Sequence, residues 1–102
     1  MFSKDTHVLV VDDSLNTRRI IVDTLQRLGF AKITTAEDAV EALGKLKFFV
    51  KTPHGIGLIL SDLNMPGPSG LDFLKQVRAD KEFETVPFLL VTTESEKGAV
   101  IE

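Results

Sequence analysis

The sequence predicts an α/β fold in which a doubly wound parallel sheet is covered by helices. Short aliphatic, β-branched runs alternate with amphipathic helical patterns along the 102 residues. This order is typical of parallel sheets with right-handed crossovers. The strand-like runs, such as Val8–Val11, are apolar at every position, which indicates strands that are buried on both faces. The length suits one domain, because domains typically run ~50–200 residues.

The first half of the chain predicts two strand–helix units. Residues 8–11 form the first strand, and Ser14 can cap a helix over residues 15–28 that ends at Gly29. One stripe of this helix is apolar and consists of Ile21, Leu25 and Leu28. Residues 32–35 form a second strand, whose polar character suits a sheet edge, and residues 37–49 form a helix with acidic residues in its first turn. The apolar face of that helix consists of Ala39, Leu43 and Leu46.

The second half predicts two more strands and two more helical segments. Residues 58–60 form a buried strand that ends at Asp62, and a loop rich in proline and glycine follows over residues 64–70. A helix with Leu71, Leu74 and Val77 on one face covers residues 71–79, and residues 88–91 form the fourth strand. A last helical pattern follows Thr92, and the sequence stops within its opening turns at residues 100–102.

Composition and charge exclude several classes of function. Twelve Lys and Arg residues against fifteen Asp and Glu residues give a formal charge of −3, which is not the basic footprint of a nucleic-acid or anionic-membrane binder. Without cysteine there is no disulfide, thiolate metal site or cysteine nucleophile. No apolar run is long enough to span a membrane, and the first residues do not form a signal peptide. We therefore expect a cytosolic protein that binds neither nucleic acid nor membranes directly.

Three acidic residues follow two of the predicted strands. Asp12 and Asp13 come after the first strand, and Asp62 ends the third. These two strands are neighbours in a doubly wound sheet, so the carboxylates can converge at its carboxyl edge. Mg²⁺ suits such a shallow site made of oxygen ligands, and without a metal at least one carboxyl group should have a raised pKa. Thr92 at the end of the fourth strand adds a hydroxyl, and the set favours phosphoryl transfer with Asp62 as acceptor.

Each of these residues also has a purely structural interpretation. An Asp-Asp pair after a strand commonly caps a helix, and an Asp before a Pro/Gly loop is commonly a turn residue. The sequence favours a functional site because acidic or hydroxyl groups end three separate strands on the same edge of one sheet.

Several motifs resemble the receiver domain of two-component response regulators, and most closely its single-domain chemotaxis type. The matching segments are Val8–Ser14, Arg18–Ile20, Leu28–Phe30, Asp62–Pro66 with Gly70, and Val91-Thr92. The resemblance implies a flavodoxin-like (CheY-like) doubly wound sheet with strand order 2-1-3-4 over the residues present. The chemotaxis member of this family is itself a standard example of that fold.

The resemblance also implies the role of each site residue. Asp62 would accept a phosphoryl group from a histidine kinase or a small acyl phosphate, and the Thr92 hydroxyl would bind that group. Asn64 and Glu94 occupy positions that influence how long the acyl phosphate lasts. The implied Mg²⁺ ligands are Asp12, Asp13, Asp62 and the backbone carbonyl of Asn64. The chain would thus be a signalling phosphoacceptor and not an enzyme, acting on a downstream partner such as a motor switch or an output domain.

The chain is one strand and one helix shorter than the receiver pattern. We therefore expect a single, C-terminally truncated receiver domain over residues 1–102, without the fifth-strand lysine that contacts the phosphoryl group. Lys97 is the nearest lysine to Thr92, but it lies on the last helical pattern. We expect the fourth strand to be an apolar open edge, which favours a homo-oligomer that covers it.

Two other interpretations remain open. In the first, the chain is a truncated receiver fragment that oligomerises, by domain exchange or edge pairing, and whose switching by phosphorylation is impaired. A haloacid-dehalogenase-like phosphohydrolase is disfavoured, because a second acidic residue is expected two positions after its nucleophile and position 14 is serine. The two histidines, His7 and His54, are both expected to be solvated.

Overall fold

The computed structural model describes residues 3–53, 55–91 and 99–101, the last three by their backbone alone. Its elements are, in order, β1 (His7–Val11), α1 (Leu15–Arg27), β2 (Ile33–Ala36), α2 (Ala39–Phe49), β3 (Ile56–Asp62), α3 (Gly70–Ala79), β4 (Phe88–Val91) and β5 (Ala99–Ile101). The sheet has the order β2-β1-β3-β4-β5, and its first four strands are parallel. The predicted parallel order 2-1-3-4 is confirmed.

The end of the chain differs from the prediction. Residues 99–101 form β5, which runs antiparallel beside β4 and pairs Ala99 with Val91 and Ile101 with Leu89. The prediction of a helix at residues 100–102 was wrong for Val100 and Ile101, whose β-branched side chains suit a strand. The prediction of an unpaired edge along Leu89–Val91 was also wrong, because the exposed N–H and C=O groups of an edge strand attract a further strand. The predicted helix start after Thr92 lies outside the described residues.

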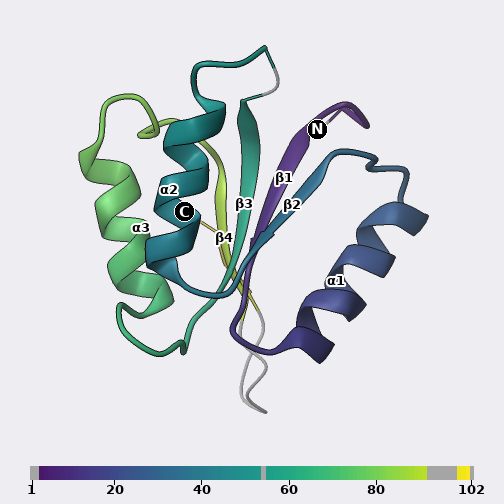
Figure 1. Ribbon diagram of the computed structural model, residues 1–102, viewed down its shortest axis with the longest axis horizontal. Coiled ribbons are helices and arrows are strands. Elements are labelled where there is room, and N and C mark those ends of the chain that lie inside the picture. Colours follow the sequence, from purple (N-terminus) through teal and green to yellow (C-terminus); the bar gives the residue numbers. More distant parts are fainter. Residues whose placement is uncertain (1–2, 54, 92–98, 102) are drawn as a thin grey trace.

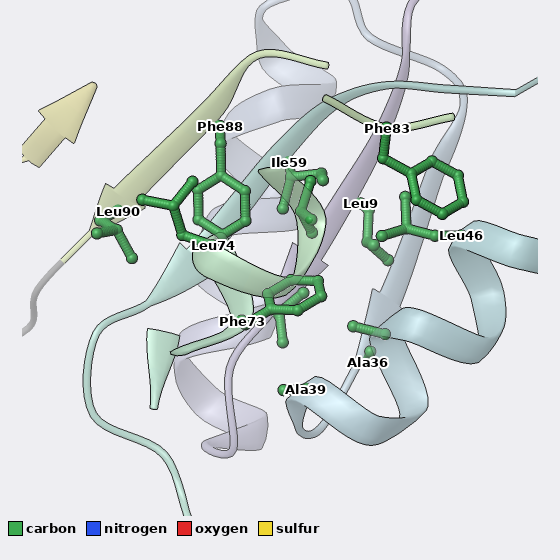
Figure 2. Packing of buried hydrophobic residues seen from close by; sticks show 13 residues of the cluster. Leu9, Ala36, Ala39, Leu46, Ile59, Phe73, Leu74, Phe83, Phe88 and Leu90 are labelled. Carbon is green, nitrogen blue, oxygen red and sulfur yellow. The ribbon is translucent and has the colours of Figure 1, made fainter. Parts of the chain in front are cut away.

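Helices lie on both faces of the sheet, with α2 and α3 on one face and α1 on the other (Figure 1). Side chains of successive strand residues point to opposite faces, so β1 contributes to two separate apolar clusters. Leu9 and Val11 join the larger cluster beneath α2 and α3, and Val8 and Val10 join the smaller one beneath α1. Figure 2 shows the larger cluster, in which the rings of Phe73 and Phe88 meet edge to face at 5.4 Å.

The ends of α1 follow the predicted signals. The Ser14 side chain accepts a hydrogen bond from the Thr17 N–H and caps the helix. Gly29, with φ of +102°, takes the left-handed conformation that ends it. Leu25 of the predicted apolar stripe is buried, but Leu28 is 62% exposed and does not pack as predicted. No helix of the described segments combines the length and the apolar character needed to cross a membrane.

His7 is buried, contrary to the prediction that it is solvated. It is the first residue of the central strand β1 and is only 7% exposed. Its Nε2 lies 2.6 Å from Thr34 Oγ1, and its ring meets the edge of Phe49 at 4.6 Å. A position in a strand with neighbours on both sides therefore overrides the preference of histidine for the surface. His54 lies outside the described residues.

Candidate functional site

β1 and β3 are neighbours at the centre of the sheet and end at the same edge, where α1 begins (Figure 1). Their register pairs Val11 with Ser61, so the next residues along the two strands, Asp12 and Asp62, come to the same level. Residues from the two halves of the chain therefore meet at one point of the sheet edge.

Hydrogen bonds fix Asp12 on three sides. Its N–H donates to Ala36 O at 3.1 Å, its carbonyl accepts from Arg18 Nη1 at 2.6 Å, and its Oδ1 accepts from the Ser14 N–H at 2.8 Å. Burial raises the pKa of the Asp12 carboxyl above its ordinary value. The Ser14 N–H lowers this pKa, the Asp13 carboxylate raises it, and the Arg18 guanidinium lowers it, each by less than burial raises it. Asp12 is therefore held in place with a carboxylate that lacks full charge compensation.

Asp62 is the last residue of β3 and is 8% exposed. Burial is the main cause of its raised pKa, and the neighbouring Asp12 carboxylate is the next. Backbone N–H groups of Asn64 and Leu63 hydrogen bond to the Asp62 carboxylate and oppose this rise, while Asp13 adds to it. The prediction that a carboxyl group here has a raised pKa is confirmed for both Asp12 and Asp62.

The three carboxylates form a compact set of oxygen atoms. One oxygen each of Asp12, Asp13 and Asp62 lies within 4.8 Å of the others, and the described residues contain no second acidic or histidine group of this kind. Two oxygens bound to one Mg²⁺ at about 2.1 Å lie at most about 4.2 Å apart. The present spacing of up to 4.8 Å exceeds this limit, so the three side chains must draw closer together to bind one ion. The donor set fits, because it consists of oxygen atoms and carries uncompensated negative charge.

The loop that follows Asp62 ends at Gly70, whose backbone lies against the end of β3. The Gly70 N–H donates to Leu63 O at 2.8 Å, and a Cβ at position 70 would lie 2.1 Å from Asp62 O and 2.9 Å from Leu90 Cδ2. Only glycine fits there. Its lack of a side chain allows the first turn of α3 to rest directly against the end of β3.

The structure brings together Asp12, Asp13 and Asp62 as predicted and places Asn64 two residues beyond, in the loop. Thr92, Glu94 and Lys97 lie outside the described residues. Arg18 and Gly70 both lie in segments that match the receiver motifs, but the sequence interpretation gave neither residue a role. The position of Gly70 after a Pro/Gly loop was a signal for its role. The contact of the Arg18 side chain with the Asp12 carbonyl has no such signal in the sequence.

Comparison with known sequences agrees with this site. Residues 8–102 match the family described as "Response regulator receiver domain". The Chemotaxis protein CheY1 of Helicobacter pylori is 46% identical over 94 residues, which cover 92% of this chain and 73% of that protein. Chemotaxis protein CheY-3 of Vibrio cholerae is 36% identical over 102 residues, which cover 100% of this chain and 75% of that protein.

Solved structures show the same fold. The chemotaxis response regulator CheY4 of Vibrio cholerae superposes with a TM-score of 0.75 at 38% identity, over 89% of this chain and 71% of that one. The response regulator TrrA of Thermotoga maritima, solved in complex with Mg²⁺ and BeF, gives a TM-score of 0.73 at 37% identity, over 88% of this chain and 71% of that one.

Proposed function

The chain belongs to the response regulator receiver domain family, and from this premise we propose that it is the phosphoacceptor module of a chemotaxis-like two-component system. Asp62 takes a phosphoryl group from a histidine kinase or a small acyl phosphate, with Mg²⁺ as cofactor. The observation that carries the proposal is the approach of the Asp12, Asp13 and Asp62 oxygens to within 4.8 Å at the end of two central strands.

In the proposed step, a carboxylate oxygen of Asp62 attacks the phosphorus atom of the donor. A new P–O bond forms, the bond between phosphorus and the donor nitrogen or oxygen breaks, and its electron pair leaves with the donor. The product is an acyl phosphate on Asp62. The N–H groups of Leu63 and Asn64 hold the carboxylate in place, and the Thr92 hydroxyl binds the transferred oxygens.

The two other aspartates supply the negative charge that makes a cation necessary. Asp12, Asp13, Asp62 and the backbone carbonyl of Asn64 are the proposed Mg²⁺ ligands. When bound, Mg²⁺ supplies charge neutralisation for the carboxylates and for the phosphoryl oxygens. Without that neutralisation the site would repel an anionic donor, because three carboxylates already face each other.

The proposal includes partners and location. The donor is a histidine kinase, and the phosphorylated form acts on a downstream protein such as a motor switch component or an output domain. The protein is a signalling phosphoacceptor and not an enzyme, works in the cytoplasm, and binds neither nucleic acid nor membranes directly. Self-association is part of the proposal and is treated in the Discussion.

Intact-mass spectrometry after incubation with acetyl phosphate and Mg²⁺ tests the proposed function. We expect one added phosphoryl group on the wild type and on D23N, whose carboxylate is exposed on α1 and pairs with Arg27. We expect none on D62N, and none on the wild type with EDTA.

Other outcomes separate the alternatives. An unmodified wild type in a stable oligomer would favour the poorly switching fragment. Repeated turnover of varied phosphoesters would favour a phosphohydrolase and overturn the proposal.

A further inference from the structure

Arg18 reaches back from the first turns of α1 to the end of β1. Its side chain is half-buried, and its Nη1 donates to the Asp12 carbonyl oxygen at 2.6 Å. The Asp12 N–H is bonded to Ala36 O of β2 at 3.1 Å on the other side. The peptide groups of Asp12 are therefore fixed by β2 on one side and by α1 on the other.

We propose that Arg18 is a positioning residue for the cation site. It holds the turn between β1 and α1, and thereby Asp12 and Asp13, without touching the cation itself. The inference rests on the proposed function, because it concerns the same Mg²⁺ site.

The turn that Arg18 supports carries two of the three carboxylates that lie close together. Residues 12–14 belong to neither β1 nor α1, and Asp13 is exposed. The two adjacent carboxylates repel each other and the Asp62 carboxylate, because one oxygen of each lies within 4.8 Å of the others. A hydrogen bond from a charged donor is stronger than one between neutral groups. The Arg18 bond therefore opposes the tendency of the metal-free turn to open.

Arg18 has two effects on a cation, and they differ in sign. Its positive charge near Asp12 repels Mg²⁺, whereas its hydrogen bond keeps the ligands in place. Residues that orient metal ligands commonly change metal affinity by about 10–100-fold when they are replaced. We therefore expect the positioning effect to exceed the repulsion.

Arg19 provides a matched control. It is the next residue of α1, carries the same charge, is exposed, and lines with Arg18 a groove of about 300 Å³ between α1 and β2. Among the described residues, no hydrogen bond joins Arg19 to the turn at Asp12, whereas Arg18 has one. Replacing Arg19 therefore removes an equal charge from the same surface and leaves the turn supported.

The experiment is an amide NMR titration of the whole chain with MgCl₂. For R18L we expect the dissociation constant to rise about tenfold, with shifts in the metal-free spectrum concentrated at residues 12–14. For R18K, which keeps the charge and loses the terminal guanidinium donor, we expect a smaller rise in the same direction. For R19L we expect binding like that of the wild type.

Each result decides the inference. Wild-type binding in both R18L and R18K, or tighter binding in R18L, would overturn the role of Arg18 while leaving the proposed function intact. If R18L does not fold, R18K decides alone, because repulsion by charge is the same in R18K and in the wild type. A wild type that binds no Mg²⁺ would overturn the proposed function itself, and the inference with it.

Discussion

At the scale of single residues, the buried carboxyl groups of Asp12 and Asp62 set how stability depends on pH. Both have a folded-state pKa above the ordinary value, mainly because of burial. The folded state then binds protons more tightly than the unfolded state, so the free energy of unfolding of metal-free protein falls as pH rises from about 4. The loss is complete once pH exceeds the raised pKa values.

The D62N substitution removes the part of this loss of stability that the Asp62 carboxylate causes. In EDTA at neutral pH we expect the Tm of D62N to exceed that of the wild type, because asparagine carries no charge to bury. The difference should shrink as pH falls through the raised pKa of Asp62 and level off below about pH 4, where the carboxyl is protonated in both the folded and the unfolded state. Thermal unfolding followed by circular dichroism measures it, with D23N as control. Equal Tm values at neutral pH would contradict the prediction.

Gly70 is the second residue with a specific effect on the site. In G70A the new Cβ would meet the backbone oxygen of Asp62 at 2.1 Å, so either α3 or the end of β3 must move. We expect a loss of about 1–3 kcal/mol in the free energy of unfolding and slower phosphorylation by acetyl phosphate, because the acceptor shifts. Urea unfolding and intact-mass time courses measure both. A G70A variant with wild-type stability and rate would show that the contact is not restrictive.

At the scale of elements, Gly44 is the counterpart of Gly70. It lies within α2 and is exposed, and a Cβ there would have no heavy atom within 4 Å. Alanine is more favourable than glycine inside a helix by about 0.8–1.0 kcal/mol. We therefore expect G44A to raise the urea midpoint with an unchanged phosphorylation rate. A lower midpoint would mean that α2 needs flexibility at this position.

The elements could be predicted where local signals act alone. Ser14 and Gly29 mark the ends of α1, and the apolar run at residues 88–91 marks β4. The failures have tertiary causes. His7 is buried because β1 lies between two strands, and residues 99–101 form a strand because the edge of β4 is available to them.

The site also divides into features that the sequence predicts and contacts that it does not. The meeting of Asp12 with Asp62 follows from strand order, which the alternation of strands and helices already indicates. The supports at Arg18 and Gly70 depend on the path of one long side chain and on one close approach of backbone. No periodicity in the sequence encodes either contact.

At the scale of the whole molecule, the two faces of the sheet differ. Among the described helices, α2 and α3 cover one face and α1 alone lies on the other (Figure 1). Three large apolar side chains on or just beyond α1 are more than half exposed, namely Leu15, Ile20 and Leu28. Val40 and Phe48 of α2 are exposed to a similar degree on the other face, but α1 has no second described helix beside it, and exposed apolar surface there favours self-association.

We therefore expect a concentration-dependent homodimer in sedimentation velocity experiments. The I20S substitution should weaken it, because Ile20 is 67% exposed on the α1 face. V40S is the control, since Val40 is 71% exposed on α2, on the opposite face. A monomer at high protein concentration, or equal weakening by both substitutions, would contradict this expectation.

The pairing of β1 with β3 has a consequence for folding kinetics. Asp12 and Asp13 come from one half of the chain and Asp62 from the other, so a cation has its full ligand set only after these two strands have paired. If the pair forms before the transition state, Mg²⁺ increases the folding rate. If it forms later, Mg²⁺ slows unfolding and leaves the folding rate unchanged. A chevron plot with and without Mg²⁺ thus shows whether β1 and β3 pair before or after the transition state of folding.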